Sequence, residues 1–211
     1  MRFLAPFLFA LIGGCATIVV SLQLDERFGP PDPGRFDRPA VASSGAPDYW
    51  NEVRPILDQR CVSCHACYDA PCQLNLASYA GITRGASAKP VYSSARLLAD
   101  EPTRLNFDAL TNRDWRDKGF FPVLNERAQV PEANREGGAM YRMLALKRAA
   151  PWPVSGPLES RDLDFSIDRE QICVRAAAMD DYAQRHPQRG MPFGLPPLAN
   201  AEYRTLTKWL E

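Results

Sequence analysis

A C-x-x-C-H run from Cys61 to His65 constrains this 211-residue chain more than any other feature. In this pattern two thiols add across the vinyl groups of a haem, and the imidazole that follows ligates the iron. The spacing brings both sulfurs to one edge of the porphyrin and places the imidazole beneath the ring. We therefore predict covalent haem c attachment through Cys61 and Cys64, with His65 as an iron ligand.

Two other kinds of site share part of this pattern. A thioredoxin-like redox pair also uses C-x-x-C, but it needs no histidine at the next position and usually follows a strand in a βαβ unit. A zinc site needs a second ligand pair at matching spacing. Both stay open as alternatives, and both leave part of the motif unexplained.

Two further cysteines follow the motif. Together with it, Cys67 and Cys72 give C-x2-C-x2-C-x4-C, which is close to a cluster-binding ferredoxin run. That run has three residues before its last cysteine and a proline after it, whereas here there are four and Pro71 comes before. An iron–sulfur cluster therefore remains an alternative. For an exported protein we favour a Cys67–Cys72 disulfide, closing a ring of about six residues and stabilising by roughly 2 kcal/mol. We expect Cys173 to be a buried, inert thiol.

The N-terminus resembles an export signal. Arg2 precedes an apolar run from Phe3 to Leu24, which charged residues then follow. We predict that residues 1–24 are a signal peptide or a membrane anchor. A lipoprotein-like box ends at Cys15, so lipidation there is a third alternative. Export places the protein in the periplasm, free or held at the inner membrane, and agrees with haem c and with a disulfide.

Composition narrows the class of protein. Twenty-five basic and 25 acidic residues give zero net charge, and no Lys/Arg tract stands out, so we expect no nucleic-acid partner. The 19 prolines gather in a few segments, among them Gly29–Pro39 and Met191–Pro197, which predicts long loops. Residues 25–47 have the composition of a linker, and residues 48–211 that of a haem domain.

Apolar spacing and capping residues predict a mainly α fold. The expected helices are Asp48–Arg60, Ser78–Ile82, Asn112–Asp117, Pro131–Arg148, Asp168–Arg185 and Asn200–Leu210. Pro55 should kink the first helix. The apolar run Phe120–Leu124 is expected in the core, with a lipid-facing surface as the alternative. The order of elements predicts a cytochrome c-like domain whose first and last helices pack together, with a long loop-rich insertion between the haem motif and the closing helix.

A second iron ligand is expected from the proline-braced loop before the closing helix. We favour Met191, because methionine–histidine ligation suits this layout. The alternatives are His186, the only other histidine, and a Met191 that merely fills a gap. Met140 and Met143 are expected to fill the core rather than to bind iron.

Four stretches resemble the bacterial fatty acid cis/trans isomerases. They are Cys61–Leu76, Gly119–Arg127, Pro131–Lys147 and Gly190–Leu198, within a resemblance that covers about Pro47 to Glu211. The resemblance implies a periplasmic haem c enzyme that converts cis double bonds in membrane phospholipid acyl chains to trans under solvent or heat stress. Cys61, Cys64 and His65 fall on that family's own C-x-x-C-H. Members are several times longer, so this chain resembles their haem-containing N-terminal part.

A rival function is that of a periplasmic electron-transfer cytochrome c without a substrate. Electron transfer favours a filled, rigid sixth coordination site on the iron, whereas alkene chemistry favours one that is open or weakly held. The second ligand therefore separates the two functions.

Overall fold

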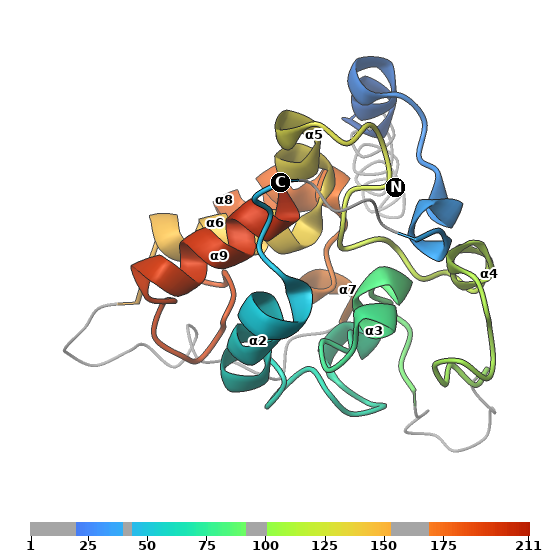
Figure 1. The fold of residues 1–211 in the computed structure, drawn as a ribbon, viewed down its shortest axis with the longest axis horizontal. Coiled ribbons are helices and arrows are strands. Elements are labelled where there is room, and N and C mark those ends of the chain that lie inside the picture. Colours follow the sequence, from blue (N-terminus) through green and yellow to red (C-terminus); the bar gives the residue numbers. More distant parts are fainter. Residues whose placement is uncertain (1–19, 40–43, 92–100, 153–168) are drawn as a thin grey trace, which may run out of the picture.

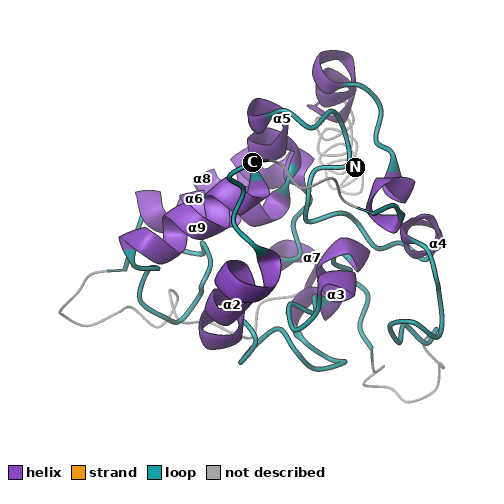
Figure 2. Ribbon diagram, in the orientation of Figure 1, coloured by secondary structure: helices purple, strands orange, loops and turns teal. Residues whose placement is uncertain are grey.

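The computed structural model describes residues 20–39, 44–91, 101–152 and 169–211. Within these ranges the chain forms helices joined by long loops and contains no β-strand (Figure 2). Two isolated bridges, Ala86 to Phe121 and Leu105 to Ala109, are the β-type pairings there. The expected mainly α fold with long loops is confirmed.

The helical elements follow one another along the chain as Figure 1 labels them. They are η1 (Pro33–Asp37), η2 (Tyr49–Val53), α2 (Arg54–Arg60), η3 (Pro71–Gln73), α3 (Tyr79–Arg84), α4 (Asn112–Asp117), α5 (Pro131–Gly137), α6 (Ala139–Ala149), α7 (Arg169–Ile172), η5 (Ala176–Ala178), α8 (Met179–Arg185) and α9 (Asn200–Leu210). Residues 20–28 are also helical.

The helix that leads into the motif starts with a wide turn. The Asp48 carboxylate accepts a hydrogen bond from the Asn51 backbone N–H at 2.7 Å, which caps the π-helical η2. The α-helical geometry of α2 begins only at Arg54. Pro55 therefore falls in the first turn of α2, where its missing N–H has no intrahelical partner to lose.

The first and last helices pack together, as expected. Val53, Leu57 and Leu206 are fully buried in one apolar cluster. At the end of α2, Arg60 forms an ion pair with Glu202 of α9 at 2.9 Å. Figure 1 shows α2 beside α9. The motif therefore begins where α2 is held against the closing helix.

Capping explains where the short helices begin. Ser78 caps α3 by accepting from Gly81 N–H at 3.0 Å. Thr111 and Asp114 form a reciprocal capping box at the start of α4. Asn200 is not the cap of α9 but its first residue. Ala199, the residue before the helix, donates its backbone N–H to the carboxylate of Glu202 at 2.7 Å.

Two predicted long helices are interrupted. Pro131–Arg148 is divided into α5 and α6, because Gly138 is extended at φ −107° and ψ 119°. A Cβ on Gly137 would lie 2.5 Å from Asn125 Oδ1, so a close tertiary contact occupies the place of a side chain. The glycine pair costs the helix about 1 kcal/mol per residue against alanine, which favours the break.

The predicted helix Asp168–Arg185 is also wrong as one element. Its described part consists of α7, η5 and α8. The gap after α7 contains Cys173, which is bonded to a distant cysteine, as described below. A covalent tie of this kind overrides local helical preference.

The apolar run Phe120–Leu124 belongs to the core. Phe120, Phe121, Val123 and Leu124 are each exposed by 9% or less, so the expected core position is confirmed and this run is no lipid-facing surface.

Much of the expected linker, residues 25–47, lies on the domain. Leu24 and Phe28 pack on Ala133 of α5. Further along, the Asp37 carboxylate accepts from the Asn112 backbone N–H at 3.0 Å. Part of this stretch therefore has packing partners in the second half of the chain, and its role as a linker stays a prediction.

The signal or anchor segment lies mostly outside the described residues. Residues 1–19, with Cys15, are not described, so cleavage, anchoring and lipidation stay predictions. In the described ranges, no helix has both the length and the apolar character that crossing a bilayer requires.

We predict that Leu57→Ala lowers the free energy of unfolding by about 2–5 kcal/mol, because it opens a cavity between α2 and α9. Urea unfolding followed by circular dichroism measures this. Leu110→Ala is the matched control: that side chain is 80% exposed, so its effect should stay within about 0.5 kcal/mol. Equal effects of the two changes would contradict the packing described here.

Candidate functional site

The C-x-x-C-H motif continues α2 as a tight turn. The backbone N–H of His65 donates to the Cys61 carbonyl at 2.9 Å, and the His65 carbonyl accepts from Leu76 N–H at 2.7 Å. These two bonds fix the backbone of the histidine. Cys61 and Cys64 are both free thiols, the first partly buried and the second exposed.

The motif lies on the wall of a cavity of about 230 Å³. This volume is somewhat below the roughly 300–1,000 Å³ of typical ligand pockets. Because Cys64 both lines the cavity and is exposed, the cavity opens to the surface at the motif. The wall is formed by residues of α2, the motif, η3, α6, α7 and α8 and by several loops, among them the loop before α9. These residues are Arg60, Cys61, Cys64, His65, Pro71, Cys72, Leu74, Leu76, Ala86, Phe121, Val123, Ala139, Met140, Met143, Leu144, Ile172, Cys173, Val174, Tyr182, Arg189, Met191, Pro192, Phe193 and Leu195.

His65 has the properties expected of a metal ligand. Its side chain is buried, and within the described structure its Nδ1 atom has no hydrogen-bond partner. Burial lowers the pKa of His65, and backbone groups of Leu74 and Pro71 oppose this only in part. The imidazole is therefore neutral at pH 7, which is the form that binds a metal ion.

The thiol of Cys61 does not suit a redox pair. Burial raises the pKa of Cys61 to about 11, against a smaller opposite effect of Arg60. Reactive C-x-x-C pairs instead rely on a lowered thiol pKa, since the thiolate is the nucleophile. The raised pKa of Cys61 counts against Cys61 as the attacking thiolate of a thioredoxin-like pair.

Metal-cluster alternatives lose ligands in this arrangement. In the part of the chain that the structure describes, no group of three or more His, Cys, Asp or Glu side chains could hold a metal ion. The ferredoxin-like run also lacks its fourth thiolate, because Cys72 is in a disulfide. While Cys72 is in the disulfide, it is therefore not available as a cluster ligand.

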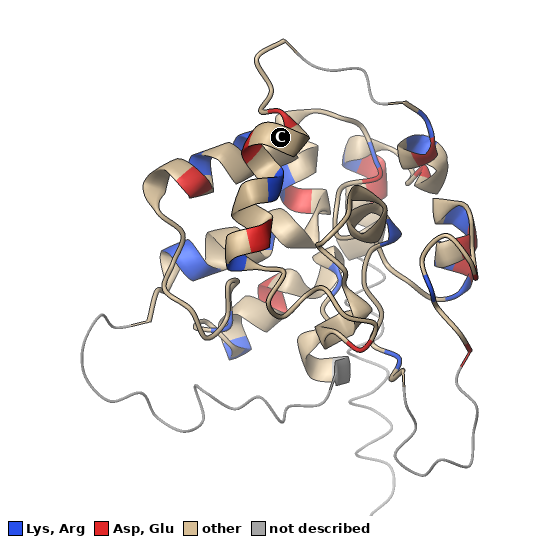
Figure 3. Ribbon diagram, turned by 60° about the horizontal axis from the view of Figure 1, so that its bottom comes forward, with Lys and Arg blue, Asp and Glu red and all other residues tan. Residues whose placement is uncertain are grey.

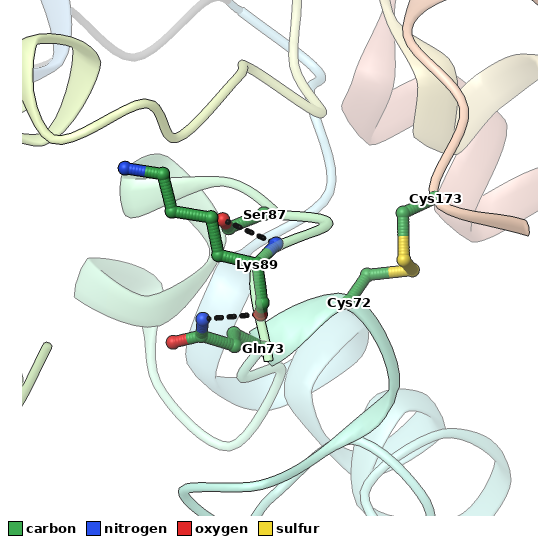
Figure 4. Close-up of a disulfide and its surroundings, with 5 residues drawn as sticks. All are labelled: Cys72, Gln73, Ser87, Lys89 and Cys173. Atoms are coloured by element: carbon green, nitrogen blue, oxygen red, sulfur yellow. Dashed lines mark hydrogen bonds between the residues drawn. A yellow bond between two sulfur atoms is a disulfide. The ribbon is translucent and has the colours of Figure 1, made fainter. Parts of the chain in front are cut away.

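The disulfide joins Cys72 to Cys173, not to Cys67 (Figure 4). The Cα atoms of the pair are 5.3 Å apart, and 101 positions separate the two residues in sequence. Cys67 is a free, exposed thiol. The predicted Cys67–Cys72 pairing and the inert Cys173 are therefore both wrong. Instead of closing a small ring with Cys67, Cys72 links the segment that follows the motif to the residues that follow α7.

Backbone contacts hold the Cys72 side of this link in place. The Cys72 carbonyl accepts from Ser87 N–H at 2.7 Å. Next to it, Gln73 Nε2 donates to the Lys89 carbonyl at 2.8 Å (Figure 4). Cys72 and Gln73 both have positive φ, 56° and 49°, a conformation that needs such support in residues other than glycine.

Met191 lines the same cavity as His65. Its backbone N–H donates to the Met143 carbonyl of α6 at 3.0 Å. A Cβ on Gly190 would lie 2.1 Å from the Lys147 backbone nitrogen, so only glycine lets the loop approach α6 this closely. Tight backbone contact therefore holds the Met191 loop on α6.

His186 is less well placed as a ligand. It is not among the described residues that line the cavity. Its ring contacts Tyr182, which does line the cavity, at 5.1 Å between centroids. This arrangement favours Met191 over His186 as the second-ligand candidate.

Several wall residues carried no signal in the sequence. Phe121 and Tyr182 fit an ordinary core, and their positions on the wall follow only from the fold. Met140 and Met143 were expected in the core, yet both are half-buried and line the cavity.

The wall is mostly apolar, with few charges. Arg60 is paired with Glu202, so its guanidinium is already compensated. Elsewhere the molecule carries both signs, and in Figure 3 basic and acidic residues alternate along the helices. The site therefore suits an apolar guest more than a phosphate or a nucleic acid.

The residues present fit a covalently attached haem. Two free thiols, an imidazole with an unpaired buried nitrogen and a thioether all line one apolar cavity. Cys61 and Cys64 would hold the macrocycle, His65 would bind the iron, and Met191 would be the candidate for a second iron ligand.

Comparison with known families identifies one match. The family model described as fatty acid cis/trans isomerase matches residues 100–211, which is just over half of the chain. Searches of curated proteins and of solved structures gave no match. The matched residues supply the α6, α8 and Met191 parts of the cavity wall, while the C-x-x-C-H motif precedes them.

We predict that replacing Cys173 by serine lowers the free energy of unfolding by up to about 4.7 kcal/mol, because the link closes a loop of some 100 residues. Cys67→Ser is the matched control and should leave stability unchanged. Non-reducing peptide mapping should find Cys72 joined to Cys173. A Cys67–Cys72 peptide, or equal stability of the two variants, would contradict this pairing.

Proposed function

The chain belongs to the fatty acid cis/trans isomerase family, and from this we propose that a haem c in the cavity equips it for that reaction. The reaction class of the family is cis/trans isomerisation of fatty acyl double bonds. The observation that carries the proposal is the shared wall. The family-matched residues and the motif line one apolar cavity, and His65 on its wall has a buried nitrogen without a hydrogen-bond partner among the described residues.

The residues of the chain divide the work. Cys61 and Cys64 attach the cofactor covalently, so it is retained outside the cytoplasm without a tight pocket on every side. His65, held neutral by burial, donates its nitrogen lone pair to the iron. When bound, the haem supplies an electrophilic iron that can draw π electron density from a C=C bond and ease rotation about it.

The cavity wall positions the substrate. Isomerisation moves no proton to or from solvent and consumes no second substrate, so the wall needs no acid or base. Apolar side chains such as Phe121, Leu144 and Ile172 offer an acyl chain contacts that water does not. Excluding water from the double bond is therefore the main contribution of these residues.

We extend the proposal to the biological setting. The substrates are unsaturated acyl chains of membrane phospholipids, and the protein is periplasmic, with residues 1–24 as its export signal or anchor. The trans products pack more densely, which suits adaptation to solvent or heat stress. The haem domain, residues 48–211, is proposed to be cytochrome c-like, in keeping with its packed first and last helices.

One observation favours the rival function of electron transfer. The Met191 loop is fixed on α6 by the Met191–Met143 backbone bond and by the close approach of Gly190. A loop held this firmly suits a permanent sixth ligand. The family match favours isomerisation. The strength of a bond between the Met191 sulfur and the iron would therefore decide between electron transfer and isomerisation.

We predict that cells expressing the chain show a higher trans/cis ratio in their phospholipid acyl chains, measured by gas chromatography. His65→Ala and Cys64→Ala should return the ratio to that of cells without the chain, because the cofactor loses a ligand or an attachment. Cys67→Ser is the control and should behave like the unchanged protein. A ratio that stays high in His65→Ala would contradict haem-dependent isomerisation.

We also predict that Met191→Ala changes the absorption spectrum of the oxidised protein and lets cyanide bind faster, because it removes the second ligand. His186→Ala is the matched control, since His186 does not line the cavity. If His186→Ala changes the spectrum and Met191→Ala does not, the histidine is the ligand. If Met191 is a weakly held ligand that leaves the iron to admit the alkene, Met191→Ala should keep isomerase activity. Loss of that activity in Met191→Ala would exclude this role.

A further inference from the structure

One loop carries the two most exposed large apolar side chains among the described residues. Phe107 is 74% exposed and Leu110 is 80% exposed. Both belong to residues 104–110, a short loop before α4. Single exposed apolar residues are common on soluble proteins, but two such side chains on one short loop indicate a surface for contact.

The loop is rigid rather than loosely placed. The backbone N–H groups of Phe107 and Asp108 both donate to the Arg104 carbonyl, at 3.3 and 3.1 Å. The side chains of Arg104 and Asp108 form an ion pair at 2.8 Å, and Leu105 bridges Ala109. A closed turn of this kind loses little conformational entropy when it binds.

The loop also has a buried inner side. Ala109 packs with Trp115 and Phe120 in a small apolar cluster, and Leu105 packs against it. The exposure of Phe107 and Leu110 therefore does not come from a loop that failed to pack. The fold buries one apolar side of the loop and presents the other to solvent.

The base of the loop contacts the segment that follows the C-x-x-C-H motif. The backbone N–H of Thr103 donates to the Tyr68 hydroxyl at 3.2 Å. Tyr68 is four residues after the exposed, cavity-lining Cys64, so their Cα atoms are at most about 14 Å apart. In Figure 1 the loop that follows α2 and the loop that precedes α4 both lie along the lower side of the molecule.

We propose that residues 104–110 insert Phe107 and Leu110 into the surface of a phospholipid membrane and so hold the cavity opening near the lipid. This rests on the proposed function, because a membrane acyl substrate has to reach the cavity from the bilayer. Two exposed apolar side chains on one short turn suit insertion among lipids, whereas docking to a protein favours a larger flat or grooved face.

Arg104 suits the same position. Its guanidinium carbon lies 4.2 Å from the centre of the Phe107 ring. Asp108 compensates the charge of Arg104 through their ion pair at 2.8 Å, so both charged ends can stay at the headgroup level while the arginine stem lies beside the ring. The loop therefore combines two apolar anchors with a compensated ion pair at their base.

The test reads insertion at the loop itself, because the apolar N-terminal run can hold the chain on a membrane by other means. The full chain carrying Phe107→Trp is mixed with phosphatidylcholine vesicles that contain brominated acyl chains. The added tryptophan should be quenched, after subtraction of the signal of the unchanged protein. Val130→Trp, at a position 46% exposed, is the matched control and should show no added quenching.

A second measurement separates this proposal from the proposed function. The double variant Phe107→Asp/Leu110→Asp should isomerise vesicle phospholipids at least about tenfold more slowly, because two apolar anchors are lost. On free unsaturated fatty acid dispersed in detergent it should match the unchanged protein. If the unchanged protein is inactive on both substrates, the proposed function fails, while the quenching experiment still decides on the loop.

Two results would overturn the insertion. One is equal quenching at positions 107 and 130. The other is absence of quenching at 107 together with a shift from dimer to monomer in the double variant, measured by sedimentation, which would assign the loop to contact between two copies of the chain. Circular dichroism of each variant should match that of the unchanged protein, since the side chains at positions 107, 110 and 130 are all exposed.

Discussion

The Cys72–Cys173 disulfide holds together the two halves from which the cavity is built. Cys72 follows the C-x-x-C-H motif, while Cys173 belongs to the segment that the isomerase family model matches. Both residues line the cavity. Without this bond, only non-covalent contacts such as the Arg60–Glu202 pair would join the motif to the rest of the wall. The position of His65 relative to Met191 depends on these connections, and so does any chemistry between them.

Within that frame, the environment of each group suits one role. Burial keeps the His65 imidazole neutral and leaves its Nδ1 unpaired, which is costly unless a partner is supplied. Burial also keeps Cys61 in the thiol form, so the motif is poorly suited to disulfide exchange. An apolar wall surrounds both. These features agree with a covalent cofactor and an apolar substrate, which is the combination that the family match and the motif suggest separately.

Local signals predicted much of the fold. The helices Asn112–Asp117 and Asn200–Leu210 were found at their observed bounds because capping residues and apolar spacing act within a few residues. The break at Gly138 was missed, because it depends on Asn125 packing against Gly137 from another segment. The partner of Cys72 was missed for a similar reason. Cysteine spacing favours near neighbours, and a partner 101 residues away leaves no local trace.

The candidate site was predictable only where chemistry is written into a motif. Cys61, Cys64, His65 and Met191 were predicted from spacing and context, and all four line one cavity. Tyr182 and Phe121 fit a core as well as a cavity, and a sequence does not distinguish the two. Exposure of Phe107 is likewise a property of the folded loop, since the same residue type is buried at position 120.

The central claim is that the cavity holds a haem bound covalently through Cys61 and Cys64. The most direct test is the intact mass of the exported chain after acid–acetone extraction, which removes haem that is not covalently bound. We predict that the extracted protein keeps the mass of one haem, and that the Cys61→Ala/Cys64→Ala double variant loses it. Release of all haem from the unchanged protein, or an exported chain with the mass of the polypeptide alone, would contradict the account.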